Sequence, residues 1–262
     1  MRTLILPATM LLCICAMAAW RGNKPVEAAS QNFSDDFSAG KLDTSKWEIA
    51  TYRSPDSKAG VNEGKYVADA FDFATGMLRI KVTQRQESNG LVRSMGGAII
   101  SKERFGYGNY EFVMRMSTTA DTPDGQGKTL TGAISSGFVY YNNSESEIDL
   151  EFLGNENATH ITNWQNPTPS HQPAGEVKQT DKVSDEFLGS QFRKYTLVWL
   201  AGSVKVYIDD VLVVSHDKHV PSSPAHIILQ HRGTNSDEWG GTATVGVTRY
   251  FYVKSVKFTP AP

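Results

Sequence analysis

Three carboxylates occupy alternate positions in the segment SESEIDLEFLG, which runs from Ser144 to Gly154. In a β-strand, residues at positions i, i+2 and i+4 lie on the same face. Glu147, Asp149 and Glu151, here called the carboxylate row, are therefore predicted to project together from one face of a strand. The opposite face, which would point into the core, carries the apolar residues Ile148, Leu150 and Phe152.

The chemistry open to this row is nucleophilic and acid–base chemistry at a sugar. Two carboxyl groups about 5–5.5 Å apart support glycoside hydrolysis with retention of configuration, in which one attacks the anomeric carbon and the other acts first as acid and then as base. The Cα atoms at i and i+4 of a strand lie roughly 13 Å apart, so the Glu147 and Glu151 side chains must lean toward each other. A carboxylate between them raises the pKa of the acid by its charge and holds the nucleophile by a hydrogen bond.

Two other interpretations of the carboxylate row compete with this one. A solvated outer face of a half-buried strand is common, but Asp and Glu are depleted in strands and neighbouring like charges repel. A cation site would use carboxylates, usually together with loop carbonyls. No Lys or Arg lies between Lys128 and Lys178, so no basic residue nearby in the sequence neutralises the row. We therefore favour the catalytic interpretation.

The rest of the chain indicates one all-β domain. It has 262 residues, of which 40% are hydrophobic, enough for a single sizeable core. Short alternating runs are separated by Gly, Asn, Asp and Pro, a pattern typical of a sandwich or barrel. Two of these runs, Tyr195 to Trp199 and Val204 to Ile208, predict a hairpin, and Asp209-Asp210 predicts the next turn. A formal net charge of −2 gives no basic field for a nucleic-acid partner.

The N-terminal residues MRTLILPATMLLCICAMAAW resemble a secretory signal. Arg2 is followed by an apolar run too short for a transmembrane helix, and Ala16-Met17-Ala18 forms a small-residue cleavage pattern. We expect a signal peptide at 1–19, a polar linker at 20–32, and a secreted or extracytoplasmic protein. No later segment is apolar enough to span a membrane.

Both cysteines, Cys13 and Cys15, lie inside this signal segment. Its removal would leave a mature protein without a cysteine or a disulfide. Acylation of Cys15 would instead give a lipoprotein, but Ile14 is large at a position where a small residue is expected. We therefore expect secretion without a lipid anchor.

The carboxylate row also carries a resemblance to glycoside hydrolase family 16. The family signature E-I-D-x-E stands here as Glu147-Ile148-Asp149-Leu150-Glu151. The segments FGYGNYEFVMRM (105–116) and FRKYTLVWLAGSVKVYIDDVLV (192–213) are similar to further family motifs, as are 162–164, 220–224 and 238–239. The resemblance covers nearly all of the mature chain and implies a family 16-like catalytic domain at 33–260.

This resemblance implies a β-jelly-roll sandwich of two bent antiparallel sheets with a concave cleft, similar to concanavalin A. It makes Glu147 the nucleophile, Glu151 the acid/base and Asp149 the assisting carboxylate. The uninterrupted E-x-D-x-E spacing is similar to the lichenase and xyloglucan-transglycosylase branch. The residues expected to contact substrate are Tyr140, Asn163, Trp164, His231 and Trp239.

The sequence departs from the family pattern at several positions. Glu145 stands where many lichenases have Trp, and Ala98-Ile99-Ile100 replaces an acidic-Tyr-Arg run. The LQHRG segment (229–233) replaces an aromatic N-x-W segment. Lys254 occupies the position of an Asp that helps to bind a structural calcium in the family, so no metal or other cofactor is expected.

The resemblance favours a monomeric, secreted endo-β-glucanase, with mixed-linkage β-1,3-1,4-glucan as the first choice of substrate. β-1,3-Glucan and xyloglucan come next. A transglycosylase on the same scaffold, in which a sugar hydroxyl replaces water, is the second hypothesis. A non-catalytic carbohydrate-binding protein is the third, because fold does not fix function.

Overall fold

The computed structural model describes residues 31–262 except 74, 172–176 and 185–188. The predicted signal peptide, and the predicted linker up to residue 30, lie outside these described residues. In the described part the chain forms β-strands and one turn of 3-10 helix, η1 (Ala68–Ala70). None of the helical structure described there is long and apolar enough to cross a membrane.

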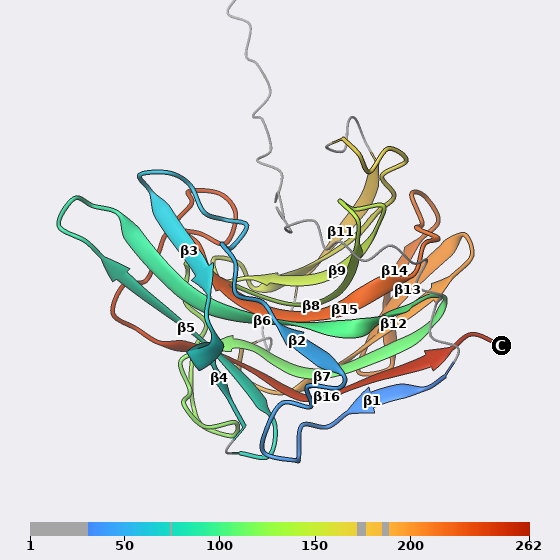
Figure 1. Ribbon diagram of the computed structural model, residues 1–262, viewed down its shortest axis with the longest axis horizontal. Coiled ribbons are helices and arrows are strands. Elements are labelled where there is room, and N and C mark those ends of the chain that lie inside the picture. Colours follow the sequence, from blue (N-terminus) through green and yellow to red (C-terminus); the bar gives the residue numbers. More distant parts are fainter. Residues whose placement is uncertain (1–30, 74, 172–176, 185–188) are drawn as a thin grey trace, which may run out of the picture.

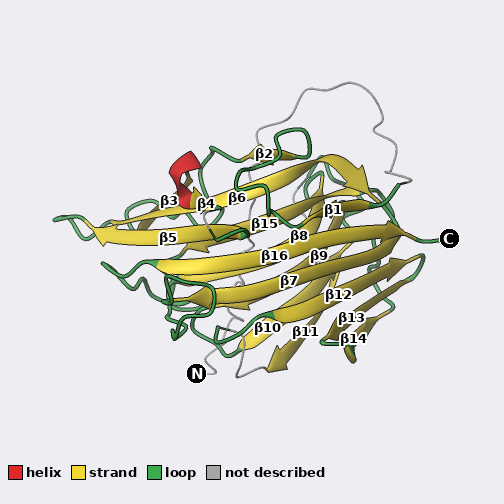
Figure 2. Ribbon diagram, turned by 90° about the horizontal axis from the view of Figure 1, so that it is seen from below, coloured by secondary structure: helices red, strands yellow, loops and turns green. Residues whose placement is uncertain are grey.

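The strands make one continuous, strongly bent sheet that folds into two layers (Figures 1 and 2). The first layer, here called the cleft layer, contains β2 (Trp47–Ile49), β6 (Val92–Phe105), β15 (Ala225–Gly233), β8 (Ala133–Tyr141), β9 (Ser146–Leu153), β10 (Ala158–Trp164) and β11 (Lys178–Ser184). The second, here called the back layer, contains β1 (Phe33–Asp35), β4 (Phe71–Asp72), β5 (Leu78–Gln86), β16 (Arg249–Pro260), β7 (Gly108–Thr118), β12 (Arg193–Leu200), β13 (Ser203–Ile208) and β14 (Val211–His216). This two-layer, antiparallel jelly roll confirms the predicted fold class.

Strands β5 and β6 connect the two layers. The first half of β5 pairs with β16 in the back layer, whereas its second half pairs with the start of β6. The rest of β6 pairs with β15 in the cleft layer, and β3 (Asn62–Tyr66) runs parallel to its start. At this crossing a Cβ on Gly96 would lie 2.3 Å from the His231 carbonyl oxygen, so only glycine permits the close backbone approach.

The core lies between the layers and is built from the apolar faces of the strands. Ile148, Leu150 and Phe152 of β9 have no exposed surface, as the alternating pattern predicts. Tyr195 and Trp199 are also fully buried, and the predicted hairpin is formed by β12 and β13. The next turn, Asp209-Asp210, has φ angles of 48° and 69°, which Asp tolerates better than most residues.

The ends of the described domain lie side by side. β1 pairs with β16 in an antiparallel register that places Phe33 opposite Phe258. On β16, the Lys254 ammonium lies 5.2 Å from the centre of the Phe192 ring, a cation–π contact. The position that the family resemblance associates with a calcium ligand therefore carries a positive charge.

Candidate active site

The carboxylate row lies on the concave face of the cleft layer, as predicted. The pairing of β9 with β8 and β10 arranges cleft-facing side chains in rows across the strands. Figure 1 shows β8 and β9 side by side in this layer. Tyr140 and Trp164 flank Glu147, Phe138 and Thr162 flank Asp149, and Ser136 and His160 flank Glu151. The register of β11 extends these rows with Lys178, Thr180 and Lys182. A curved layer thus directs three carboxylates and several aromatic rings into one groove.

This groove is a cleft of about 670 Å³ above the row. Its floor comes from β8, β9, β10 and β15, and its walls from the loops that contain residues 55–61 and 234–239. A volume of this size is typical of a ligand-binding cleft. The two wall loops are connected, because the Asn235 amide donates to the Val61 carbonyl at 3.4 Å.

Glu147 is held at one end of the row by a tight turn. Asn142, Asn143 and Ser144 all have positive φ angles, and the turn aims the Ser144 hydroxyl at the Glu147 carboxylate, to which it donates a hydrogen bond. Burial raises the pKa of Glu147 to about 7, and the nearby charge of Glu151 acts in the same direction. The Ser144 hydrogen bond opposes that rise because it favours the charged form.

Asp149 lies between the two glutamates and receives a hydrogen bond from the Trp164 indole nitrogen at 3.2 Å. Burial raises the pKa of Asp149 well above its ordinary value, and the charges of Glu147 and Glu151 raise it further. A hydrogen bond between the two carboxyls lowers the pKa of Glu147 and raises that of Asp149. In this contact Asp149 is the carboxyl that favours the protonated form.

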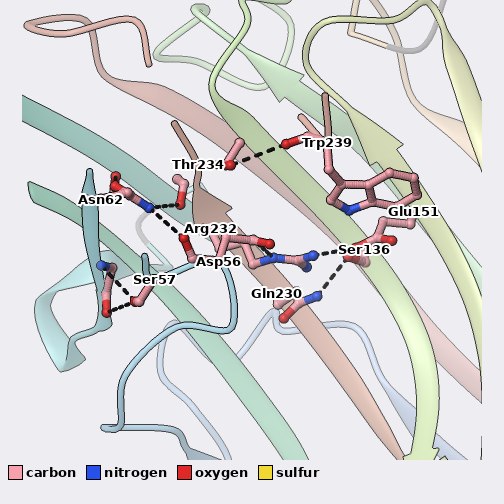
Figure 3. Close-up of polar contacts among 12 residues, drawn as sticks. Asp56, Ser57, Asn62, Ser136, Glu151, Gln230, Arg232, Thr234 and Trp239 are labelled. Carbon is pink, nitrogen blue, oxygen red and sulfur yellow. Dashed lines mark hydrogen bonds and ion pairs between the residues drawn. The ribbon is translucent and has the colours of Figure 1, made fainter. Parts of the chain in front are cut away.

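Glu151 has a different partner at the other end of the row. The Arg232 Nη2 atom lies 2.6 Å from Glu151 Oε1, and the Arg232 Nε atom pairs with Asp56 (Figure 3). Only 2% of the Arg232 side chain is exposed. Sequence reasoning missed Arg232 and Asp56, although the replacement of the N-x-W segment by LQHRG drew attention to the right strand.

Three of the predicted substrate contacts line the cleft: Tyr140, Trp164 and Trp239. Tyr140 and Trp164 flank the Glu147 end of the row. Trp239 belongs to the 234–239 loop, and its ring lies 5.0 Å from that of His160, the residue opposite Glu151. Aromatic rings thus lie at both ends of the row.

Asn163 and His231 do not reach the cleft, so these two predictions are wrong. Both are fully buried because strand alternation turns them toward the space between the layers. Asn163 donates to the carbonyls of Lys218 and His219. His231 contacts the Ile80 carbonyl and the Ser117 hydroxyl, and burial lowers its pKa to about 3.

The family model for glycosyl hydrolases family 16 matches residues 61–247. The chain belongs to this family. A beta-glucanase of Acetivibrio thermocellus is 28% identical over 249 residues, which cover 91% of this chain and 64% of that protein. A beta-glucanase of Paenibacillus polymyxa is 29% identical over 168 residues, which cover 62% of this chain and 63% of that protein.

The family 16 fold is also found in a solved structure. A prokaryotic beta-1,3-1,4-glucanase (lichenase) derived from a mouse hindgut metagenome superimposes with a TM-score of 0.69, at 21% identity. The match covers 88% of this chain and 99% of that one. By contrast, this family 16 chain spans a little under two thirds of the length of the two curated relatives.

Proposed function

We propose that this protein is an endo-acting β-glucan hydrolase that cleaves with retention of configuration. The observation that carries the proposal is the placement of Glu147, Asp149 and Glu151 along one cleft, with Glu147 bound by Ser144 and Glu151 bound separately by Arg232. Two carboxyls of one chemical type in contrasting environments take different catalytic roles. Membership of family 16 supports the same assignment.

The first half-reaction forms a glycosyl-enzyme. The Glu147 carboxylate attacks the anomeric carbon while the bond to the leaving oxygen breaks, and Glu151 transfers its proton to that oxygen. Asp149 keeps its proton and donates a hydrogen bond to Glu147, which orients the attacking oxygen. The leaving sugar chain departs with a new hydroxyl group.

The second half-reaction releases the bound sugar. Glu151, now a carboxylate, takes a proton from a water molecule as the water oxygen attacks the anomeric carbon. The bond between that carbon and Glu147 breaks, and Glu147 returns as a carboxylate. Two displacements at the same carbon restore its original configuration.

The cleft supports a polymeric glucan substrate. Faces of aromatic rings suit the apolar faces of pyranose sugars, and Tyr140, Trp164 and Trp239 supply rings along the groove. Mixed-linkage β-1,3-1,4-glucan is the substrate we favour, because the relatives are named beta-glucanases and the lichenase has the same fold. We also propose secretion, on the basis of the N-terminal signal pattern.

The test is a reducing-sugar and product-size assay on lichenan, barley glucan, laminarin, xyloglucan and agarose. Glu147→Gln is the inactive variant, and Glu111→Gln is the matched control, because Glu111 pairs with Lys257 in the back layer. The proposal expects short oligosaccharides from one glucan, lost only in Glu147→Gln, with NMR showing the β-anomer formed first. Products longer than the substrate would indicate transglycosylation, and binding without turnover would indicate a carbohydrate-binding protein.

A further inference from the structure

Arg232 links the acid/base end of the carboxylate row to a wall of the cleft. Its Nε atom pairs with Asp56 on the 55–61 wall loop, and its Nη2 atom donates to Glu151 Oε1 at 2.6 Å (Figure 3). The exposed fractions of the side chains are 2% for Arg232, 12% for Asp56 and 14% for Glu151. A buried cation between two partly buried carboxylates is costly to desolvate, so its presence calls for a specific role.

We propose that Arg232 is a positioning residue for the acid/base and that Asp56 anchors it; this inference rests on the proposed function. Arg232 binds one defined oxygen of Glu151, Oε1. A protonated carboxyl keeps its accepting carbonyl oxygen toward a donor and its hydroxyl on the other atom. The catalytic proton is therefore held on Oε2, the oxygen free to face the leaving group.

The planar guanidinium suits this task better than a point charge. Its fork of donors reaches two carboxylates in fixed directions, which an ammonium group on a flexible chain does not reproduce. Asp56 is itself held in place, because the Asn62 amide donates to its carbonyl at 3.1 Å. The loop wall therefore fixes Arg232, and Arg232 fixes Glu151.

The charges around Glu151 determine how the activity of the enzyme changes when Arg232 or Asp56 is substituted. Arg232 brings a positive charge to the Glu151 carboxyl, and Asp56 brings a compensating negative charge to Arg232. The other titratable groups lining the same cleft are Lys58, Tyr140 on β8, Glu147 and Asp149 on β9, His160 on β10, Lys178 and Lys182 on β11, and Asp237 and Glu238 on the wall loop. These remain unchanged in variants of Arg232 and Asp56, so the two substitutions should have opposite effects.

The experiment compares kcat/KM on a natural glucan with kcat/KM on a 2,4-dinitrophenyl β-glycoside of a short β-gluco-oligosaccharide. The aryl leaving group needs no proton, so its kcat/KM does not depend on the acid. We expect Arg232→Met to lower kcat/KM on glucan about 10–100-fold and on the aryl glycoside less than about 3-fold. Arg232→Lys should recover part of the loss. Arg104→Met is the matched control, because Arg104 is a buried arginine of the same layer that stacks on Tyr141 outside the cleft.

The pH profile gives a second readout that a purely structural role would not change. The alkaline limb of kcat/KM on glucan should move to higher pH in Arg232→Met and to lower pH in Asp56→Asn, each by about 0.5–1 pH unit. Equal losses on both substrates, or shifts in the same direction, would overturn the proposal. If Arg232→Met does not fold, Asp56→Asn and Arg232→Lys still decide it. A wild-type protein that turns over neither substrate would refute the proposed function and this role with it.

Discussion

The two ends of the carboxylate row carry the same side chain in different surroundings. Glu147 accepts a hydrogen bond from the Ser144 hydroxyl and lies beside Asp149, a carboxyl whose raised pKa favours its neutral form. Burial raises the pKa of Glu147 to about 7. Glu151 instead pairs with the guanidinium of Arg232. One end is held by neutral donors and the other by a cation. Glu147 and Glu151 have the same residue type and lie on the same face of β9, so we attribute their different proposed roles to their different partners.

Replacing Glu147, the proposed nucleophile, should produce the largest effect. We expect Glu147→Gln to lower kcat on glucan by at least about 1000-fold, because the glycosyl-enzyme no longer forms. Binding of glucan and the circular dichroism spectrum should remain those of the wild type. Addition of azide to Glu147→Ala should yield a glycosyl azide of inverted configuration, because only one displacement then takes place. Wild-type turnover by either variant would refute the assignment of this end of the row.

Replacing Glu151, the proposed acid/base, should have a smaller effect than replacing Glu147. The size of this effect should depend on the substrate. Glu151→Ala should lower kcat/KM on glucan about 100- to 10,000-fold, yet leave an activated aryl glycoside much less affected. Azide should restore its turnover and give a product of retained configuration, because the Glu147 intermediate still forms. An azide product of inverted configuration from Glu151→Ala would indicate that Glu151, and not Glu147, is the nucleophile.

The hydrogen bond from Trp164 to Asp149 provides a further test of the Glu147 end of the row. Trp164→Phe keeps an aromatic ring but removes the indole donor to Asp149. We expect kcat on glucan to fall about 3- to 10-fold, the effect of losing one hydrogen bond, with KM changed less than 2-fold. A rise in KM with kcat unchanged would instead assign Trp164 to sugar binding alone.

The raised pKa of Glu147 predicts a pH-dependent change in stability. The folded-state pKa lies above the ordinary value of 4.5, so the stability contributed by this group is complete below pH 4.5 and is lost as pH rises through 7. Glu147→Gln should therefore be more stable than the wild type at pH 8, by about 3 kcal/mol, and show no gain at pH 4.5. Thermal unfolding at the two pH values measures the difference, and a gain that is equal at both would contradict it.

Sequence alone was sufficient to predict strands, and the direction of their side chains, where one face of the strand is buried and the other is open. Alternation in β9 predicted both the apolar inner face and the outward carboxylate row, and the β12–β13 hairpin was predicted in the same way. Strands β6 and β15 were not predicted. Both contain runs of consecutive buried residues, 96–99 and 227–233, which interrupt the alternation of apolar and polar residues.

The site contacts that sequence reasoning missed depend on register and long-range packing. His231 and Arg232 are neighbours in sequence but point to opposite faces, and only the pairing of β15 shows which of them faces the cleft. Asp56 is separated from Arg232 by 176 positions, so no local pattern connects them. A one-residue change in register exchanges every inward and outward side chain. His231 was expected in the cleft because segment 229–233 replaces a family motif, and that resemblance did not define which residues of the segment face the cleft.

The central claim is that Glu147 and Glu151 are not interchangeable, and trapping the covalent intermediate tests it most directly. An activated 2-deoxy-2-fluoro β-gluco-oligosaccharide slows the second displacement more than the first, so the glycosyl-enzyme accumulates. Peptide mapping by mass spectrometry should place one sugar on Glu147, within the peptide that contains the whole row. A label on Glu151, or a wild-type enzyme that hydrolyses glucan with inversion, would contradict the account.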